Sequence, residues 1–388
     1  MSFELSQRLQ ALPPYLFREL DRMRDEVKAK GVDIIDLGVG DPDRPTPTHI
    51  IAALDEAAQN PANHQYPAYS GLNAFRDTVA AWYAKRHGVK LTPATEVCSL
   101  IGSKEGIAHF PLAFVNPGDV VLVPEPAYPV YHSGTLFCGG VSHFMPLYEK
   151  NGFLPDYKSI SDDVLEEAKI IWVNYPNNPT GATAARDFYE ELVEWAKKWE
   201  IIIASDAAYS EMTFDGQPHP SILEVPGAKD VAVEFHSLSK TYNMTGWRIA
   251  WAAGGEQFIK GLGLVKSNVD SGIFQAVQVA GMAALEGDQE PVRAMGRLYG
   301  ERRAALVKGL EAAGLKVFPS KATFYVWVKL PEGLSSSEFA SRLLHEAGIV
   351  ATPGNGFGPS GEGYARFALV EETGRLNEAA ARLAELKF

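Results

Sequence analysis

The sequence predicts an α/β fold in which a large doubly wound, mainly parallel sheet domain is followed by a smaller α+β domain. Short apolar runs recur along the chain, and each is followed by Gly, Pro, Ser, Asn or Asp. Segments with helical periodicity separate several of these runs. After about Gly287 the pattern changes to long helices with a strand between them. The 388 residues are enough for about two or three domains.

The apolar runs are the expected strands of the large domain. They occupy residues 97–101, 120–123, 170–173, 201–204 and 231–235. Continuous apolar runs of this length are typical of strands that are buried on both faces. An amphipathic helix is expected between two of them, over residues 187–199. Because strands and helices alternate, the strands should be mainly parallel, with helices on both faces of the sheet.

The C-terminal part of the chain and the N-terminal segment are predicted to be mainly helical. One is expected over residues 297–313, and Ser335 with Glu338 predicts a capping box at the start of another. Residues 6–30 are also helical in composition. We therefore expect three regions: an N-terminal arm and part of the small domain over residues 1–40, the large domain over residues 41–287, and the small C-terminal domain over residues 288–388.

Charge and cysteine content exclude several classes of function. Lys and Arg number 36 against 48 Asp and Glu, which gives a net charge of −12 and argues against nucleic acid as a partner. Cys98 and Cys138 lack metal-ligand spacing, so neither a disulfide scaffold nor a metal site is expected. No apolar run is long enough for a membrane span, and the N-terminus lacks the apolar core of a signal peptide. We expect a cytoplasmic enzyme without a membrane partner.

Polar residues follow the expected strands, where doubly wound sheets bind ligands. Lys240 comes just after an apolar run, where partial desolvation would lower the pKa of its amine and favour Schiff-base chemistry. Taken alone, a lysine on a turn is more often a solvated surface residue. Ser237, Ser239 and Arg248 change this balance because two hydroxyls and a guanidinium suit a phosphate. Together they indicate a phosphate-bearing aldehyde.

Asp206 follows four apolar residues, where an ionised carboxylate is costly without a cation. A helix N-cap is the alternative interpretation of this residue. If the aldehyde is pyridoxal phosphate, its protonated pyridine nitrogen would be the partner. Gly102 and Ser103 precede a helical stretch and would offer donors to an anion, although such turns are common.

These motifs together resemble the fold-type I pyridoxal-phosphate aminotransferases of class I/II. The resemblance rests on Ser237-x-Ser239-Lys240 with Gly246-x-Arg248, on Asn178-Pro179-Thr180-Gly181, on Asp206-x-x-Tyr209 and on Tyr364-Ala365-Arg366. The motifs occur in the family's order over nearly the whole chain. Each alone would be a weak signal, whereas the set is specific.

The resemblance implies roles in holding pyridoxal 5′-phosphate. Lys240 would hold the cofactor covalently and act as the general base and acid. Asp206 would pair with the pyridine nitrogen, while Asn178 and Tyr209 would hydrogen-bond the phenolic oxygen. Tyr128 would stack on the ring, although a core aromatic is an equally good interpretation. The expected phosphate contacts are Ser103, Lys104 through its backbone, Ser237, Ser239 and Arg248.

The same resemblance concerns substrate and subunits. Arg366 would clamp the α-carboxylate of an amino acid or 2-oxo acid, assisted by the backbone of Gly40. The alternatives are a salt bridge on a strand for Arg366 and a turn glycine for Gly40. Tyr66, five residues before Gly71, would reach the phosphate in the neighbouring subunit. The active form would then be a homodimer with shared active sites.

Three local phrases are similar to the LL-diaminopimelate aminotransferases, a group within this family. They lie at residues 102–107, 237–248 and 352–358. This similarity implies conversion of tetrahydrodipicolinate and glutamate to LL-diaminopimelate and 2-oxoglutarate, a step of lysine biosynthesis.

The far end of such a substrate needs donors for a carboxylate and acceptors for an ammonium. Tyr15, Lys104 and Asn268 are the candidates for these contacts. Their alternatives are an arm anchor, a solvated lysine and a helix-surface residue. Arg44 departs from the aromatic residue usual after Asp-Pro-Asp in the broader family, so the apolar rim of the pocket is not expected at this position.

Other functions share parts of the pattern. An aminotransferase for aspartate, alanine or aromatic amino acids, or a pyridoxal-phosphate-dependent C–S β-lyase, would use the same cofactor residues. A regulator would need an added basic DNA-binding domain, and the roughly forty residues before Gly40 are too few and insufficiently basic. A nicotinamide dehydrogenase would need a G-x-G-x-x-G after an early strand, which the sequence lacks.

Overall fold

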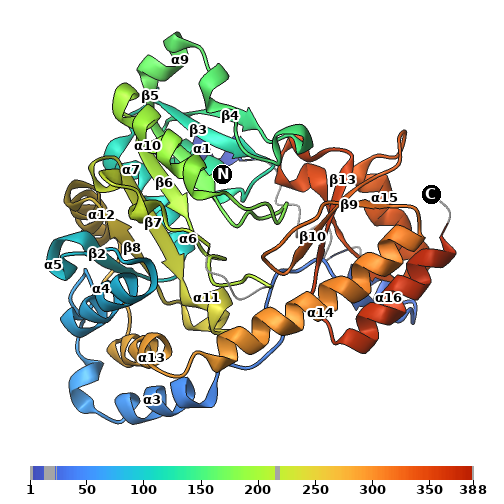
Figure 1. Ribbon diagram of the computed structural model, residues 1–388, viewed down its shortest axis with the longest axis horizontal. Helices are drawn as coiled ribbons and strands as arrows, with labels where there is room; N and C mark the ends of the chain where they lie inside the picture. The colour runs from blue at the N-terminus through green and yellow to red at the C-terminus, as the bar shows by residue number, and fades with distance from the viewer. Residues whose placement is uncertain (1–2, 13–21, 23, 215–218, 387–388) are drawn as a thin grey trace.

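A seven-stranded sheet forms the centre of the larger part of the molecule (Figure 1). The computed structural model describes residues 3–12, 22, 24–214 and 219–386. In sheet order the strands are β2 (Val97–Leu100), β8 (Ala250–Gly254), β7 (Ala232–Ser237), β6 (Ile202–Asp206), β5 (Ala168–Asn174), β3 (Val120–Glu125) and β4 (Val141–Pro146). The strands from β7 to β4 run parallel, and β8 runs antiparallel to both of its neighbours. The predicted mainly parallel sheet is therefore confirmed.

Apolar side chains cover both faces of this sheet. Ile171 and Val173 of β5 belong to one hydrophobic cluster, whereas Ile170 and Trp172 belong to another. Successive side chains of a strand point to opposite faces, so each face packs against its own layer. This two-sided burial explains why the strand reads as an uninterrupted apolar run.

Helices pack around this sheet and against one another (Figure 1). They are α3 (Thr48–Ala58), α4 (Asn73–His87), α5 (Pro93–Glu96), α6 (Ser103–His109), α7 (Pro111–Phe114), α8 (Val130–Phe137), α9 (Asp162–Glu167), α10 (Arg186–Trp199), α11 (Leu238–Thr241), α12 (Glu256–Val269) and α13 (Gln275–Glu286). The predicted helix over residues 187–199 corresponds to α10. Its buried side chains, Tyr189, Leu192, Val193 and Ala196, form the stripe that faces the sheet. None of the described helices has the length and apolarity that crossing a membrane requires.

A second, four-stranded antiparallel sheet lies beside the C-terminal helices (Figure 1). Its strands are β12 (Thr352–Pro353), β13 (Tyr364–Ala368), β10 (Tyr325–Lys329) and β9 (Lys316–Val317), and the helices are α14 (Glu290–Ala312), α15 (Ser336–Arg342) and α16 (Thr373–Glu385). The capping box of Ser335 and Glu338 is present at the start of α15, as predicted. This region has its own hydrophobic cluster.

A short segment before Gly38 joins this second region. The two-residue strand β1 (Ile35–Asp36) pairs in parallel with β11 (Ile349–Val350), and α1 (Gln7–Gln10) precedes it. Residues just before Gly38 therefore pack with the C-terminal part of the chain. The domain limits at residues 40 and 287 stay a prediction.

Some elements differ from the sequence expectations. Helix α14 begins at Glu290 rather than at residue 297, because Pro291 lies in the first turn, where a helix tolerates proline. Strands β4 and β8 were not predicted. Strand β8 is largely alanine and glycine, and β4 at the sheet edge is only partly buried, so neither forms a β-branched apolar run.

Candidate active site

A cavity of about 440 Å³ contains most of the predicted site residues. Strands β5, β6 and β7 end beside it, at Asn174, Asp206 and Ser237. Arg366 enters from β13 of the small sheet. The predicted residues that line the cavity are Gly40, Ser103, Lys104, Tyr128, Asn178, Asp206, Tyr209, Ser237, Ser239, Lys240, Arg248 and Arg366. The carboxyl ends of parallel strands thus meet the small sheet at one site.

Lys240 lies on α11, which starts directly after β7. The Ser237 hydroxyl caps this short helix by accepting a hydrogen bond from the Ser239 N–H at 3.1 Å. The Lys240 ammonium donates to the carbonyl oxygen of Gly40 at 2.8 Å. Burial lowers the pKa of Lys240 to about 8, although the negative charge of Asp41 opposes the shift. The amine is therefore desolvated, as the sequence predicts.

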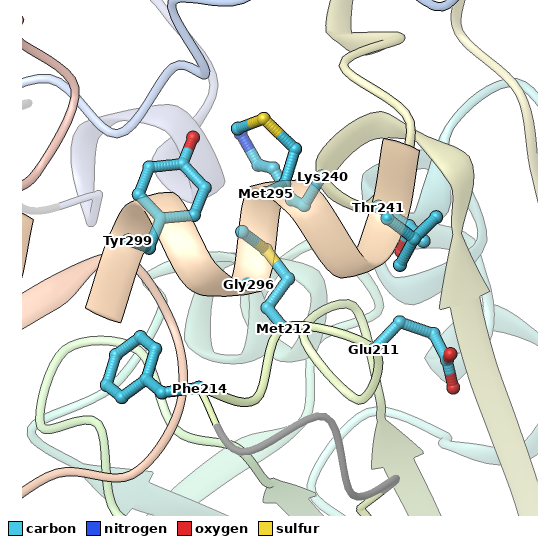
Figure 2. Close-up of a pocket in the computed structure, with 9 residues that line it drawn as sticks. Glu211, Met212, Phe214, Lys240, Thr241, Met295, Gly296 and Tyr299 are labelled. Atoms are coloured by element: carbon cyan, nitrogen blue, oxygen red, sulfur yellow. The ribbon is translucent and has the colours of Figure 1, made fainter. Parts of the chain in front are cut away.

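The stem of Lys240 packs against the long helix α14 and the turn after β6 (Figure 2). Met295 and Tyr299 of α14 lie on one side of a small cavity, and Met212 lies on the other. At Gly296 an added Cβ would lie 2.7 Å from the Thr213 carbonyl oxygen, so the helix approaches the backbone closely here. This packing holds the base of the lysine between the two regions of the molecule.

Asp206 is a buried carboxylate at the end of β6. It accepts hydrogen bonds from the Tyr131 hydroxyl at 2.7 Å and from the Ala208 N–H at 3.2 Å. Burial raises the pKa of Asp206 to about 6, although both bonds oppose this. The following residues form a turn rather than an α-helix, so the N-cap interpretation does not apply. Both donors are neutral groups, which leaves this acid suited to a cationic partner in the cavity.

Two amide side chains organise the loop that follows β5. Asn174 donates to the Asp206 carbonyl oxygen at 2.8 Å and accepts from the Asn178 N–H at 2.8 Å. The Asn178 side-chain oxygen in turn accepts from Arg366 at 2.9 Å. Tyr209 and Tyr325 share a hydroxyl–hydroxyl hydrogen bond of 3.1 Å. These contacts present amide and phenol groups to one side of the cavity.

Hydroxyl and guanidinium groups also line the cavity. They belong to Ser103, at the start of α6, and to Ser237, Ser239 and Arg248. Gly102 has φ of +77°, and an added Cβ would collide with the Arg248 guanidinium. Only glycine allows this close approach without displacement of the arginine. The arrangement has the donor chemistry of a phosphate site.

Arg366 is held rigidly by neutral partners. Its guanidinium donates to the Gly38 carbonyl oxygen at 2.7 Å, and it lies 4.2 Å from the Tyr325 ring centre and 4.7 Å from that of Phe357. Among the described residues, no hydrogen-bond partner faces its Nε. Its contacts are with carbonyl, amide and hydroxyl groups, so the strand salt bridge considered as an alternative is not what the structure shows. A carboxylate in the cavity would complete its coordination.

Two of the described residues among the predicted ones, Tyr66 and Asn268, do not line this cavity. Tyr66 is 86% exposed and lies outside it. Asn268 lies on the exposed side of α12, where its amide donates to the Leu264 carbonyl oxygen at 2.8 Å. Tyr15 lies outside the described residues. Arg44 does not line the cavity, and it pairs with Glu372 at 3.0 Å.

Several lining residues were not predicted. They are Val39, Pro129, Asn174, Ala208, Thr245, Tyr325 and Phe357. Asn174 had a sequence signal because it directly follows an apolar strand, and Ala208 lies inside the Asp206-x-x-Tyr209 motif. Tyr325 lies on a buried strand of the small sheet, and only tertiary contact brings that strand to the cavity.

A separate polar cluster lies behind the α6 turn. Ligand atoms of Glu105, His109 and Asp270 lie within 4.8 Å of one another. The Lys266 ammonium, which is fully buried, binds Glu105 at 3.1 Å and Asp270 at 2.9 Å. The lysine thus supplies the positive charge that these carboxylates need.

Comparisons with known proteins agree with this geometry. The family model "Aminotransferase class I and II" matches residues 32–383. An LL-diaminopimelate aminotransferase from Syntrophobacter fumaroxidans is 59% identical over 388 residues, which covers all of both chains. One of the same name from Aquifex aeolicus is 59% identical over 386 residues, with the same coverage. The substrate-bound BacF structure from Bacillus subtilis is 39% identical, with a TM-score of 0.94 over 99% of this chain and 98% of that one.

Proposed function

The chain belongs to the class I and II aminotransferase family, and from this premise we propose that it is an LL-diaminopimelate aminotransferase of lysine biosynthesis. It is an enzyme of the pyridoxal-phosphate-dependent transaminase type, and its cofactor is pyridoxal 5′-phosphate. The observation that carries the substrate assignment is the identity of up to 59% with relatives of that name along the full chain. The proposed substrates are tetrahydrodipicolinate and glutamate, and the products are LL-diaminopimelate and 2-oxoglutarate.

The residues of the cavity fit this cofactor. Asp206 is a buried acid whose hydrogen-bond donors are neutral, so a pyridinium nitrogen would neutralise it. The contact between Gly102 and Arg248 leaves room for no side chain and supports a phosphate site. Lys240 provides a buried amine of lowered pKa for the aldehyde. When bound, pyridoxal phosphate supplies an electron-withdrawing ring that stabilises negative charge at the substrate Cα.

We assign the proton transfer to Lys240. Its pKa of about 8 means that a substantial fraction of the amine is neutral close to physiological pH. A base whose pKa lies near the working pH can both remove and return a proton efficiently. Lys240 would move the proton at the substrate Cα.

Arg366 and its neighbours would bind and orient the substrate. The guanidinium is held between two aromatic rings and by three oxygen acceptors. A planar fork fixed in this way binds a carboxylate in one orientation. At Gly40 an added Cβ would collide with Tyr325, so the backbone itself lines the cavity and would assist Arg366. For the far end of the substrate we keep Lys104, a cavity-lining residue, together with Tyr15 and Asn268 as candidates.

We also propose a homodimer with shared active sites. Tyr66 is 86% exposed, and Tyr69, three residues later, is also exposed. The exposed Phe274 ring lies against His64, two residues before Tyr66. The segment is held in place because the Gln275 amide donates to the Gln65 carbonyl oxygen at 3.0 Å. A fixed, exposed tyrosine is suited to reach a neighbouring subunit. For the location we propose the cytoplasm, since both cysteines are buried free thiols.

A substrate panel tests the proposed reaction. The purified holoenzyme is incubated with 2-oxoglutarate and, in separate reactions, LL-diaminopimelate, aspartate, alanine and aromatic amino acids, and glutamate is measured. We expect LL-diaminopimelate to be the preferred donor. Activity confined to the other donors would refute the substrate assignment, and pyruvate release from a cysteine conjugate without an acceptor would favour the β-lyase alternative.

Subunit mixing tests the shared site. Lys240→Ala and Tyr66→Ala chains are each purified, unfolded together and refolded. If each site combines Lys240 of one chain with Tyr66 of the other, the mixed dimer contains one complete site, and mixing restores activity above that of either variant. Activity that stays at the level of the less impaired parent would contradict a shared site.

A further inference from the structure

A buried histidine outside the cavity connects two of the segments that line it. His236 lies on β7, one residue before Ser237, and is 2% exposed. Its Nδ1 accepts a hydrogen bond from the Ser237 N–H at 3.1 Å. Its Nε2 lies 2.6 Å from the Ser210 hydroxyl oxygen. One imidazole therefore bridges the end of β7 and the turn after β6.

These two bonds define the protonation state of the ring. A backbone N–H can only donate, so Nδ1 must be unprotonated and Nε2 must carry the proton that is donated to Ser210. A second proton on Nδ1 would place two donors against each other. Burial also lowers the pKa of His236 to about 3. The bridge is therefore a neutral donor–acceptor unit near neutral pH.

Aromatic packing keeps the ring in this orientation. His236 is paired with Trp251 of β8, and the two rings are stacked with centres 4.6 Å apart and an interplanar angle of 1°. The Trp82 ring meets the histidine edge-on at 5.0 Å. A ring confined on both sides cannot rotate without a loss of packing.

The bridged segments carry different contacts of the cavity. Ser210 directly follows Tyr209 in the turn that starts at Asp206, and its N–H donates to the Ala207 carbonyl oxygen at 3.1 Å. Ser237 caps α11, the helix that bears Lys240. A shift of either segment would change the spacing between the Asp206 and Tyr209 side chains and the hydroxyls of Ser237 and Ser239.

We propose that His236 is a positioning residue for the cofactor, holding the Asp206–Tyr209 turn and the Ser237 strand end at the spacing that pyridoxal phosphate requires. It acts through Ser210 and Ser237 and does not line the cavity. The inference rests on the proposed roles of Asp206, Tyr209 and Ser237 as cofactor contacts. It does not depend on which amino acid is the substrate.

Substitutions can separate the two hydrogen bonds. His236→Phe keeps a ring and removes both bonds, and Ser210→Ala removes only the hydroxyl. His236→Asn places an acceptor near the Nδ1 position, whereas His236→Gln reaches toward Ser210. His219→Phe is the matched control, because His219 is also buried and accepts from the Ala184 N–H at 3.2 Å, away from the cavity.

Three quantities are measured for each holoenzyme: the dissociation constant of pyridoxal phosphate, the pH midpoint of its visible absorbance band, and the melting temperature. We expect His236→Phe to weaken cofactor binding about tenfold or more and to move the pH midpoint. The free energy of one buried hydrogen bond corresponds to about a tenfold change in an equilibrium constant. Ser210→Ala should move the midpoint in the same direction by a smaller amount. Compared with His236→Phe, His236→Asn should restore the cofactor affinity more fully than the pH midpoint. His236→Gln should restore the pH midpoint more fully than the affinity.

The control decides between positioning and simple packing. His219→Phe should lower the melting temperature and leave cofactor affinity and pH midpoint unchanged. If His236→Phe and Ser210→Ala behave in the same way as this control, the proposal is wrong. Should His236→Phe fail to fold, Ser210→Ala alone decides, since it deletes a single oxygen. An enzyme inactive with LL-diaminopimelate would refute the substrate assignment without altering these measurements.

Discussion

The Lys240 ammonium and the Gly40 carbonyl oxygen are 2.8 Å apart, although 200 residues separate them in the chain. Lys240 follows β7 of the large sheet, whereas Gly40 follows β1, which pairs with β11 beside the small sheet. The proposed base thus lies where the two regions meet. Its environment depends on how those regions pack against each other.

Replacement of Lys240 by alanine should remove both cofactor attachment and proton transfer. We expect transamination to fall by roughly 10²–10⁴-fold or more, as is typical when a general acid–base group is lost. Absorbance spectra and glutamate formation measure the two effects. Lys260→Ala, which alters an exposed residue of α12, is the control. A variant that kept the visible absorbance and the rate would show that the assignment of Lys240 is wrong.

The lowered pKa of Lys240 predicts how the apoenzyme takes up its cofactor with pH. Only the neutral amine attacks an aldehyde, so the rate constant should rise about tenfold per pH unit well below the pKa. It should level off above about pH 8, the pKa to which burial lowers this group. Stopped-flow absorbance from pH 6 to pH 10 gives the profile. A rate that continued to rise up to pH 10 would indicate an ordinary, solvated lysine.

Arg366→Lys should weaken substrate binding while leaving the cofactor in place. Lysine keeps the charge but loses the planar fork, and hydrogen bonds to charged groups contribute about 1.5–3 kcal/mol each. We expect KM to rise about 10- to 100-fold for both the amino donor and 2-oxoglutarate. Steady-state kinetics and the absorbance spectrum provide the test. Arg186→Lys, at an exposed pair with Glu190, is the control and should change neither KM nor the absorbance spectrum. An unaltered KM in Arg366→Lys would exclude the proposed carboxylate contact.

Gly102→Ala should weaken the phosphate site through a collision with Arg248. Gly88 provides a control for a glycine of positive φ with free space around it, because nothing lies within 4 Å of an added Cβ. Its φ of +68° and ψ of 12° are left-handed helical, whereas Gly102 has φ of +77° and ψ of 150°. Gly88→Ala should cost roughly 1–2 kcal/mol of stability, the cost of a left-handed helical residue, and Gly102→Ala should cost more, because its backbone region is essentially restricted to glycine. Only Gly102→Ala should also reduce affinity for pyridoxal phosphate, about tenfold or more, measured by titration of the apoenzyme. Equal affinities for pyridoxal phosphate in the two variants would argue against a phosphate site at Gly102 and Arg248.

Local patterns in the sequence carried much of the fold and of the candidate site. Strand β5 could be recognised because both of its faces are buried, which requires a continuous apolar run. Asp206 and Lys240 could be found because each follows such a run, where a charged group is unusual. Strand β8 had no comparable signal, since alanine and glycine do not distinguish a strand from other buried segments.

Contacts between distant segments could not be predicted in this way. Tyr325 lies on a strand of the small sheet, and its place in the cavity follows from the packing of that sheet near Gly40. Asn268 stays a candidate substrate contact, and the sequence did not indicate that its amide bonds to its own helix on an exposed face. Side-chain direction on a helix depends on the neighbours that the helix meets, and a local motif does not contain them.

By itself the sequence determined which polar groups follow the strands and in what order they occur along the chain. The reason is that a strand buried on both faces needs a continuous apolar run, and the polar residues after each run mark where the strand ends. Only the tertiary structure decided which groups share a cavity, how far apart they lie, and which hidden contacts support them. His236 illustrates the difference, since its two hydrogen bonds and its stacking on Trp251 arise from neighbouring strands and turns. Such contacts depend on packing between segments that are far apart in the chain, and a local sequence pattern does not contain this information.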